Sequence, residues 1–175
     1  MPLLIVAGRT APNRAVRFGG EHDRLDERGR ADVTALADVV TGALIAGPET
    51  SVRESAALLG WSGEPVQTLA SLDVGRWRGR RPEDLTPAQL QPFFTDPHAV
   101  PHGGESVHAF VERIRAAAGD LTAESVLVVA SPVAQALLCS SASSYFSTPV
   151  RPAGVYRLEP GGSPHARVSP ARRRR

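Results

Sequence analysis

The sequence predicts an α/β fold in which a mostly parallel sheet is covered by helices on both faces. Three short runs, residues 3–7, 43–46 and 126–130, are apolar throughout and do not alternate with polar residues. Such runs are typical of strands that are buried on both faces. The segments between them show helical spacing of apolar residues, and this order of strands and helices favours a sheet with helical crossovers.

Four helices are expected, because apolar residues recur at intervals of three and four along their segments. They span residues 26–41, 49–59, 106–118 and 132–145. Gly60 is expected to end the second helix, and the third carries one apolar stripe of Val107, Phe110, Val111 and Ile114.

The remaining segments are interpreted as connections. Residues 82–104 are rich in Pro, His and Gly and predict a long loop with a short helix that covers one end of the sheet. Residues 154–159 and 166–168 are interpreted as a terminal hairpin. A length of 175 residues corresponds to about one domain, so we expect a single domain over 1–169 and a disordered Arg-rich tail over 170–175.

The charge of the chain gives no indication of a nucleic-acid partner. All 20 basic residues are arginine, and without the four arginines at 172–175 there are 16 against 18 acidic residues, a net charge of −2. The basic character is therefore a property of the tail and not of a binding face. The absence of lysine excludes Schiff-base chemistry, and together with the richness in Ala, Gly and Pro it suggests a high-G+C bacterial genome.

The single cysteine and the lack of a targeting or membrane-spanning pattern predict an intracellular protein without a metal. Cys139 is the only cysteine, which excludes an internal disulfide and a multi-cysteine zinc site. No apolar run is long enough to span a bilayer, and residues 1–7 lack the pattern of a secretory signal. We therefore expect a cytoplasmic protein that does not interact with a membrane.

Six stretches in succession carry a family pattern. The first is the strand 3–7 followed by Gly8, Arg9, Thr10 and then Asn13. The second resembles R-x-x-G-x-x-D…L…G at 17–29, and the third resembles S-P-L-x-R-A-x-x-T-A at Pro48 and 53–56. The fourth resembles L-x-E-x-D-x-G-x-W-E-G at 69–79, and the fifth resembles D-P at 96–97 followed by P-x-G-G-E-S at 101–106. The sixth, at 128–130, resembles the strand that precedes a second His-Gly. In this order they resemble the histidine phosphatase superfamily (phosphoglycerate mutase-like), over roughly residues 3–140.

The resemblance implies which positions should carry phosphotransfer chemistry. In that family a histidine after the first strand is phosphorylated, two arginines and a second histidine surround the phosphate, and a carboxylate acts as general acid. Here Ala7 falls on the nucleophile, Val6 and Ser51 on the arginines, Ser131 on the second histidine and Ser71 on the acid. A phosphoryl dianion needs convergent positive charge, and loss of a nucleophile removes orders of magnitude of rate. We therefore interpret the phosphotransfer site as dismantled.

Three residues are candidates for new chemistry, each with a structural alternative. His102 could exchange protons near neutral pH, or it could be an exposed loop histidine. Glu105 could assist it, or could support the start of the following helix. Ser131 could be a nucleophile, but Ser before Pro132 is also an ordinary helix N-cap.

The expected ligand pocket is the former phosphate cavity. Its expected lining is Val6, Ala7, Gly8, Arg9, Asn13, Arg17, Ser51, Ser71, His102 and Ser131. His98, His102 and His108 match no compact metal motif, so neither a metal nor another cofactor is expected. The oligomeric state, a homodimer included, is left open by the sequence.

Two hypotheses about function follow, and a third is less favoured. The chain could be a repurposed, cofactor-independent enzyme of specialised metabolism that performs cyclisation, isomerisation, elimination or hydrolysis on a neutral or apolar small molecule. Alternatively, it could be a non-catalytic pseudophosphatase that binds a ligand or a partner protein. Residual phosphatase activity ranks last, because no cation remains at the family positions.

Overall fold

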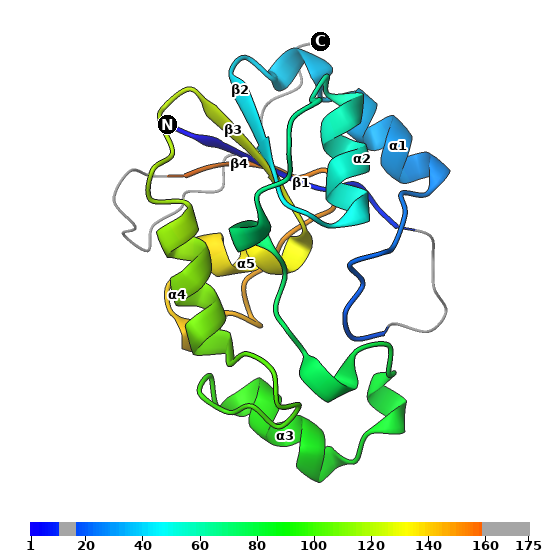
Figure 1. Ribbon diagram of the computed structural model, residues 1–175, viewed down its shortest axis with the longest axis vertical. Coiled ribbons are helices and arrows are strands. Elements are labelled where there is room, and N and C mark those ends of the chain that lie inside the picture. The colour runs from blue at the N-terminus through cyan, green and yellow to red at the C-terminus, as the bar shows by residue number, and fades with distance from the viewer. Residues whose placement is uncertain (11–16, 159–175) are drawn as a thin grey trace.

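The computed structural model describes residues 1–10 and 17–158 and contains a four-stranded sheet in the order β2-β3-β1-β4 (Figure 1). The strands are β1 (Leu3–Val6), β2 (Ala43–Ala46), β3 (Ser125–Val129) and β4 (Val155–Arg157). β3 runs parallel to both β1 and β2, whereas β4 pairs antiparallel with β1. The expected α/β fold with a mostly parallel sheet is confirmed.

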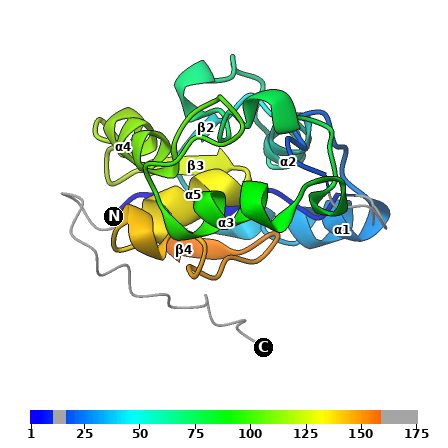
Figure 2. The same ribbon diagram turned by 90° about the horizontal axis from the view of Figure 1, so that it is seen from below.

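Helices cover both faces of this sheet. The described part of the chain has five α-helices: α1 (Glu27–Thr34), α2 (Thr50–Leu58), α3 (Pro87–Thr95), α4 (Val107–Ala117) and α5 (Ser131–Leu138). Figure 2 shows α4 on one side of the strands and α1 and α2 on the other. Alternation along the strands produces these two layers, since Leu4 packs in one buried cluster with α4 and α5, and Ile5 in another with α1 and α2.

Two helices are shorter than the apolar spacing predicts. α1 ends at Thr34, whose Oγ1 donates to the carbonyl of Arg30, and a 3₁₀ turn at Ala37–Val39 follows. That tighter turn still packs Leu36 and Val40 against the core, which explains why their spacing resembles a continued helix. α5 ends at Leu138, before a serine-rich stretch whose side chains hydrogen-bond to nearby backbone and so compete with the helix.

The segment between η2 (Gln67–Leu69) and α4 forms a separate lobe around α3, which lies beyond the end of the sheet in Figure 1. The predicted short helix is α3, capped by Thr86 and Gln89. Two glycines allow the tight turns of this lobe: Gly75 has φ +46° and Gly103 has φ +74°, conformations that other residues rarely adopt. The lobe matters because its inner side faces the carboxyl ends of the parallel strands.

The C-terminal strand β4 lies at one edge of the sheet. Val155–Arg157 pairs with β1, and its expected partner, 166–168, lies outside the described residues, as does the tail 170–175. In the parts of the chain that the structure describes, no helix has the length and apolar composition required to cross a membrane.

Candidate functional site

A cavity of about 520 Å³ lies at the carboxyl ends of the three parallel strands. Its sheet side is formed by the segments that leave these strands: Ala7 to Thr10 after β1, Glu49 and Ser51 after β2, and Ala130 to Pro132 after β3. Ligand sites of open α/β sheets lie at this edge, and the volume falls within the usual range for small-molecule pockets.

The cavity brings together most of the residues that the sequence singles out for it. Those that line it are Ala7, Gly8, Arg9, Arg17, Ser51, Ser71 and Ser131. Val6 does not, because strand alternation turns its side chain into the core with α4 and α5. His102 also lies outside the lining, and Asn13 lies outside the described residues.

Hydrogen bonds from α2 fix the floor of the cavity. The buried hydroxyl of Ser55 accepts a bond of 3.0 Å from the Gly8 N–H and donates one of 2.7 Å to the Ser51 carbonyl. The strand end at Ala7 is thereby held against the first turns of α2, where Ser51 lies. No charged side chain takes part in this arrangement.

Ser131 does not cap α5. The N-cap is Ala130, and Ser131 is the first helical residue, with Pro132 following it. In the described part of the chain the Ser131 hydroxyl makes no hydrogen bond, and the residue lines the cavity. The interpretation of this serine as a capping residue is therefore wrong, and its hydroxyl is available to a ligand.

His102 is neither exposed nor a cavity residue. Its side chain is 0% exposed, and its ring packs edge-on against Trp77 and Phe93 at centroid distances of 5.3 and 5.4 Å. Nδ1 accepts a bond from the Gly104 N–H. Burial lowers the pKa of His102, with a smaller opposing effect of Asp73, so the ring is neutral near pH 7. The prediction that it lies at the pocket mouth is wrong, because the turns at Gly75 and Gly103 fold this loop into the lobe.

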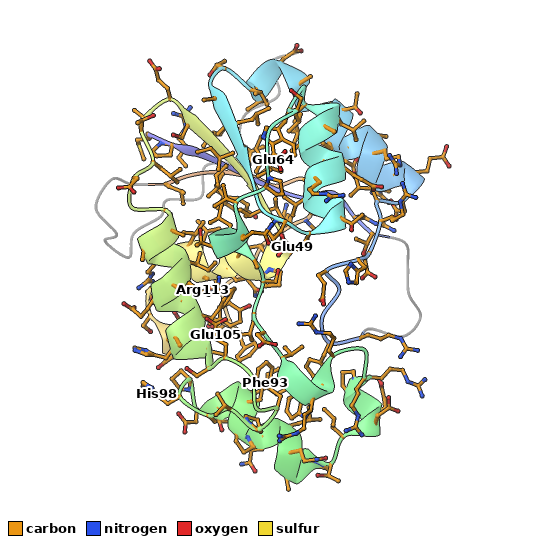
Figure 3. All side chains as sticks on the ribbon, in the orientation of Figure 1. Glu49, Glu64, Phe93, His98, Glu105 and Arg113 are labelled. Atoms are coloured by element: carbon orange, nitrogen blue, oxygen red, sulfur yellow. The ribbon has the colours of Figure 1, made fainter. Side chains whose placement is uncertain are left out.

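Glu105 lies in an ion pair rather than in the cavity. Its carboxylate accepts two bonds of 2.8 Å from the guanidinium of Arg113 on α4 (Figure 3). The same guanidinium donates to the carbonyls of Thr68 and Ala70. Glu105 thus belongs to a structural tie between α4 and the segment before Ser71, and it does not face the cavity.

His98, His102 and His108 do not gather into a metal site. The rings of His98 and His108 lie 4.4 Å apart, while His102 is buried with Trp77 and Phe93. Among residues 1–10 and 17–158 there is no group of three or more His, Cys, Asp or Glu side chains that could hold a metal ion.

The most distinctive polar group of the cavity is Glu49, which the sequence alone does not single out. Figure 3 shows it at the start of α2, between the sheet and the lobe that carries Phe93. It is only 4% exposed. Its Oε1 accepts bonds of 2.6 Å from both the N–H and the hydroxyl of Ser71, whereas its buried Oε2 has no hydrogen-bond partner among the described residues. The available signal was an acid in the leucine position of the S-P-L motif.

Aromatic side chains form the opposite wall. The cavity is lined there by Phe18, Phe93, Phe94, Tyr145 and Phe146. Their rings contact one another at centroid distances of 4.9 to 6.0 Å. Burial raises the pKa of Tyr145 far above its ordinary value, so its phenol stays neutral. The cavity therefore has a polar end at the strands and an apolar end at the lobe.

The sequence model of the histidine phosphatase superfamily (branch 1) matches residues 3–165. The chain belongs to this superfamily. Among solved structures, phosphoglycerate mutase from Thermus thermophilus is 25% identical at a TM-score of 0.74, over 89% of this chain and 90% of that one. The mycobacterial glucosyl-3-phosphoglycerate phosphatase is 21% identical at a TM-score of 0.70, over 88% and 87%, a likeness that shows the fold. No curated protein sequence matches the chain.

In this member of the histidine phosphatase superfamily, both acids and bases line the cavity. The described cavity lining contains two cations, Arg9 and Arg17. Arg9 pairs with Asp26 at 3.3 Å, and Arg17 donates to the Gly79 carbonyl. Three acids line the same cavity: Glu21, Asp23 and Glu49. The described lining is thus richer in acids than in bases, the reverse of what a phosphate dianion requires.

Proposed function

We propose that this chain has lost phosphoryl transfer and that its cavity holds a small, largely apolar organic molecule. One observation carries the proposal: Ala7, Ser51 and Ser131, the positions that the family resemblance assigns to phosphate binding, line the cavity together with the buried carboxylate of Glu49. A cavity lined at these positions by neutral groups, with a carboxylate also in its lining, favours ligands other than phosphate esters.

Energies of hydrogen bonding support this choice. A neutral hydroxyl contributes about 0.5–1.5 kcal/mol net to a hydrogen bond, and a charge-assisted bond about 1.5–3 kcal/mol. The hydroxyls of Ser51 and Ser131 cannot offset the desolvation of a dianion, and repulsion from Glu49 adds to that penalty. The aromatic wall, by contrast, gains from contact with an apolar guest.

Within this proposal we favour a repurposed enzyme that acts by proton transfer on an apolar substrate, without a cofactor. Ser131 remains a group that could face such a substrate, and Glu49 takes the place of His102 and Glu105, because Ser131 and Glu49 line the cavity. A purely binding role is the second candidate. It is favoured by the Ser131 hydroxyl, which has no basic side chain as a hydrogen-bond partner in the described residues.

We expect no phosphoenzyme and no turnover of phosphomonoesters. The reason is that neither strand end carries a histidine, since β1 leads into Ala7 and β3 into Ser131. The measurement is acid-labile incorporation of label from a phosphodonor, with a conventional member of the superfamily treated in parallel. Stoichiometric labelling of this chain would contradict the proposal.

A further inference from the structure

We propose that the molecule held by the cavity is a neutral carbonyl compound: an apolar body that packs on the aromatic wall and a carbonyl oxygen that accepts from the hydroxyls of Ser51 and Ser131. This inference rests on the proposed function and adds to it the chemical class of the ligand. It starts from two hydroxyl groups of the cavity lining that form no hydrogen bond with any described residue.

The first hydroxyl belongs to Ser51, which lies in the first turn of α2 and is 7% exposed. Its backbone carbonyl accepts from Ser55, but its hydroxyl has no partner among the described residues. The fully enclosed side-chain atoms without a partner in this part of the chain belong to Glu21, Glu49 and His102. The Ser51 hydroxyl is thus open to the cavity that this residue lines. A largely buried hydroxyl without a partner is costly, and a ligand acceptor removes that cost.

The second hydroxyl, that of Ser131, lies at the same edge of the sheet because of the strand order. β2 and β3 are neighbouring parallel strands whose register pairs Ala46 with Val128, and neighbouring strands lie about 4.8 Å apart. α2 follows β2 and α5 follows β3, so both helices begin at the same end of the sheet (Figure 1). One polar group of a ligand at this edge therefore faces the first turns of both helices.

The starts of these helices favour an oxygen that accepts hydrogen bonds. Neither α2 nor α5 has a side chain that caps its first N–H groups. Uncapped N–H groups and the positive end of each helix dipole attract partial negative charge. A carbonyl oxygen supplies this charge, has two lone pairs for two donors, and carries no proton that would meet these donors.

The acids of the cavity favour a neutral ligand over an anionic one. Three acids line it in the described residues: Glu21, Asp23 and Glu49. A carboxylate ligand would be repelled by them. The pKa of Arg113 is raised chiefly by Glu105 and also by Glu49. The charge of Glu49 is therefore partly offset by this guanidinium, and it does not call for a cationic ligand.

The aromatic wall suits the apolar body of such a molecule. Phe93, Phe94 and Phe146 line the side of the cavity opposite the strand ends. Their rings offer contact to an aryl or alkyl group. A volume of about 520 Å³ accommodates a molecule of the size of a phenylalkyl ketone.

The test compares three probes of nearly equal shape: 4-phenylbutan-2-one, 2-methyl-4-phenylbut-1-ene and 3-phenylpropanoate. The alkene replaces the carbonyl oxygen of the ketone with a methylene group, and the carboxylate replaces its methyl group with a charged oxygen. Binding to the full chain is measured by calorimetry near neutral pH. The variants are Ser51→Ala, Ser131→Ala and the double variant, and Ser62→Ala, at an exposed residue, is the matched control.

We expect the ketone to bind about tenfold more tightly than the alkene, and each single variant to weaken the ketone by about two- to tenfold, the range for one neutral hydrogen bond. In the double variant the ketone should bind no more tightly than the alkene. Ser62→Ala should leave all affinities unchanged, and the carboxylate should not bind. Because the Ser51 and Ser131 hydroxyls have no described partner, both single variants should unfold in urea like the unchanged protein, which separates lost binding from lost folding.

The outcomes separate this inference from the proposed function. If the alkene binds as tightly as the ketone, or if the ketone keeps its affinity in the double variant, the carbonyl class is overturned and an apolar ligand still stands. Tighter binding of the carboxylate than of the ketone would overturn the neutral character of the ligand. If none of the three probes binds, the carbonyl inference and the proposed small-molecule cavity are both overturned.

Discussion

Replacement of Phe93 by alanine is expected to lower the free energy of unfolding by about 3–5 kcal/mol, the range for truncation of a buried aromatic residue. Phe93 is 4% exposed and lies between the core and the cavity. Its ring contacts Phe18, Trp77, Phe94, His102 and Phe146 at 5.0–6.0 Å. The truncation would leave a void among these rings and remove the centre of the aromatic wall.

The matched control is Phe94→Ala, in the next residue of α3. Phe94 is half exposed, so its truncation removes far less buried surface and should change stability by less than about 1 kcal/mol. Urea denaturation of both variants provides the comparison. Equal losses for the two would contradict the argument that the burial of Phe93 among these rings stabilises the fold.

Replacement of Arg113 by methionine is expected to lower the free energy of unfolding by about 2–4 kcal/mol, because it leaves a largely buried carboxylate without its partner. The Glu105 and Arg113 side chains are 18% and 32% exposed. The guanidinium also binds the carbonyls of Thr68 and Ala70, in the segment that leads to Ser71. Arg113→Lys should not restore stability, since an ammonium cannot form the paired bonds to Glu105.

Arg28→Met is the control for this charge removal. Arg28 is 74% exposed on its side chain and pairs with Asp32 at 3.9 Å, so its loss should change stability by less than about 0.5 kcal/mol. Thermal or urea unfolding of Arg113→Met and Arg28→Met measures the two losses of stability. A loss at Arg113 no larger than that at Arg28 would contradict the role of Arg113 in tying α4 to the cavity edge.

The parts of the fold that depend on local periodicity could be predicted. The stripe on α4 is buried as expected, and the three apolar runs form the parallel strands. The helix ends were less accurate, because Leu36 and Val40 keep a helical spacing while packing from a 3₁₀ turn. The spacing of apolar residues alone does not distinguish a continued α-helix from a 3₁₀ turn that packs against the same core.

The cavity floor could be predicted from the family motifs, whereas Glu49 could not be predicted from its own neighbourhood. An acid immediately before a helix is usually a solvated residue that complements the helix dipole. Its burial here depends on Ser71, which lies 22 residues away in the sequence.

His102 was predicted to line the cavity, and it does not. A histidine among Pro and Gly resembles an exposed loop residue, but Trp77 and Phe93 from other segments cover it. Contacts between distant segments decide both positions.

Our central proposal is that the cavity at the strand ends does not bind phosphate. Titration of vanadate, a mimic of the transferred phosphoryl group, into the unchanged protein tests it most directly by calorimetry. We predict no saturable binding, because Arg9 and Arg17 have other partners and Glu49 repels the anion. Saturable binding in the micromolar range that is lost in Arg9→Ala or Arg17→Ala would contradict the claim, since these arginines would then form an anion site.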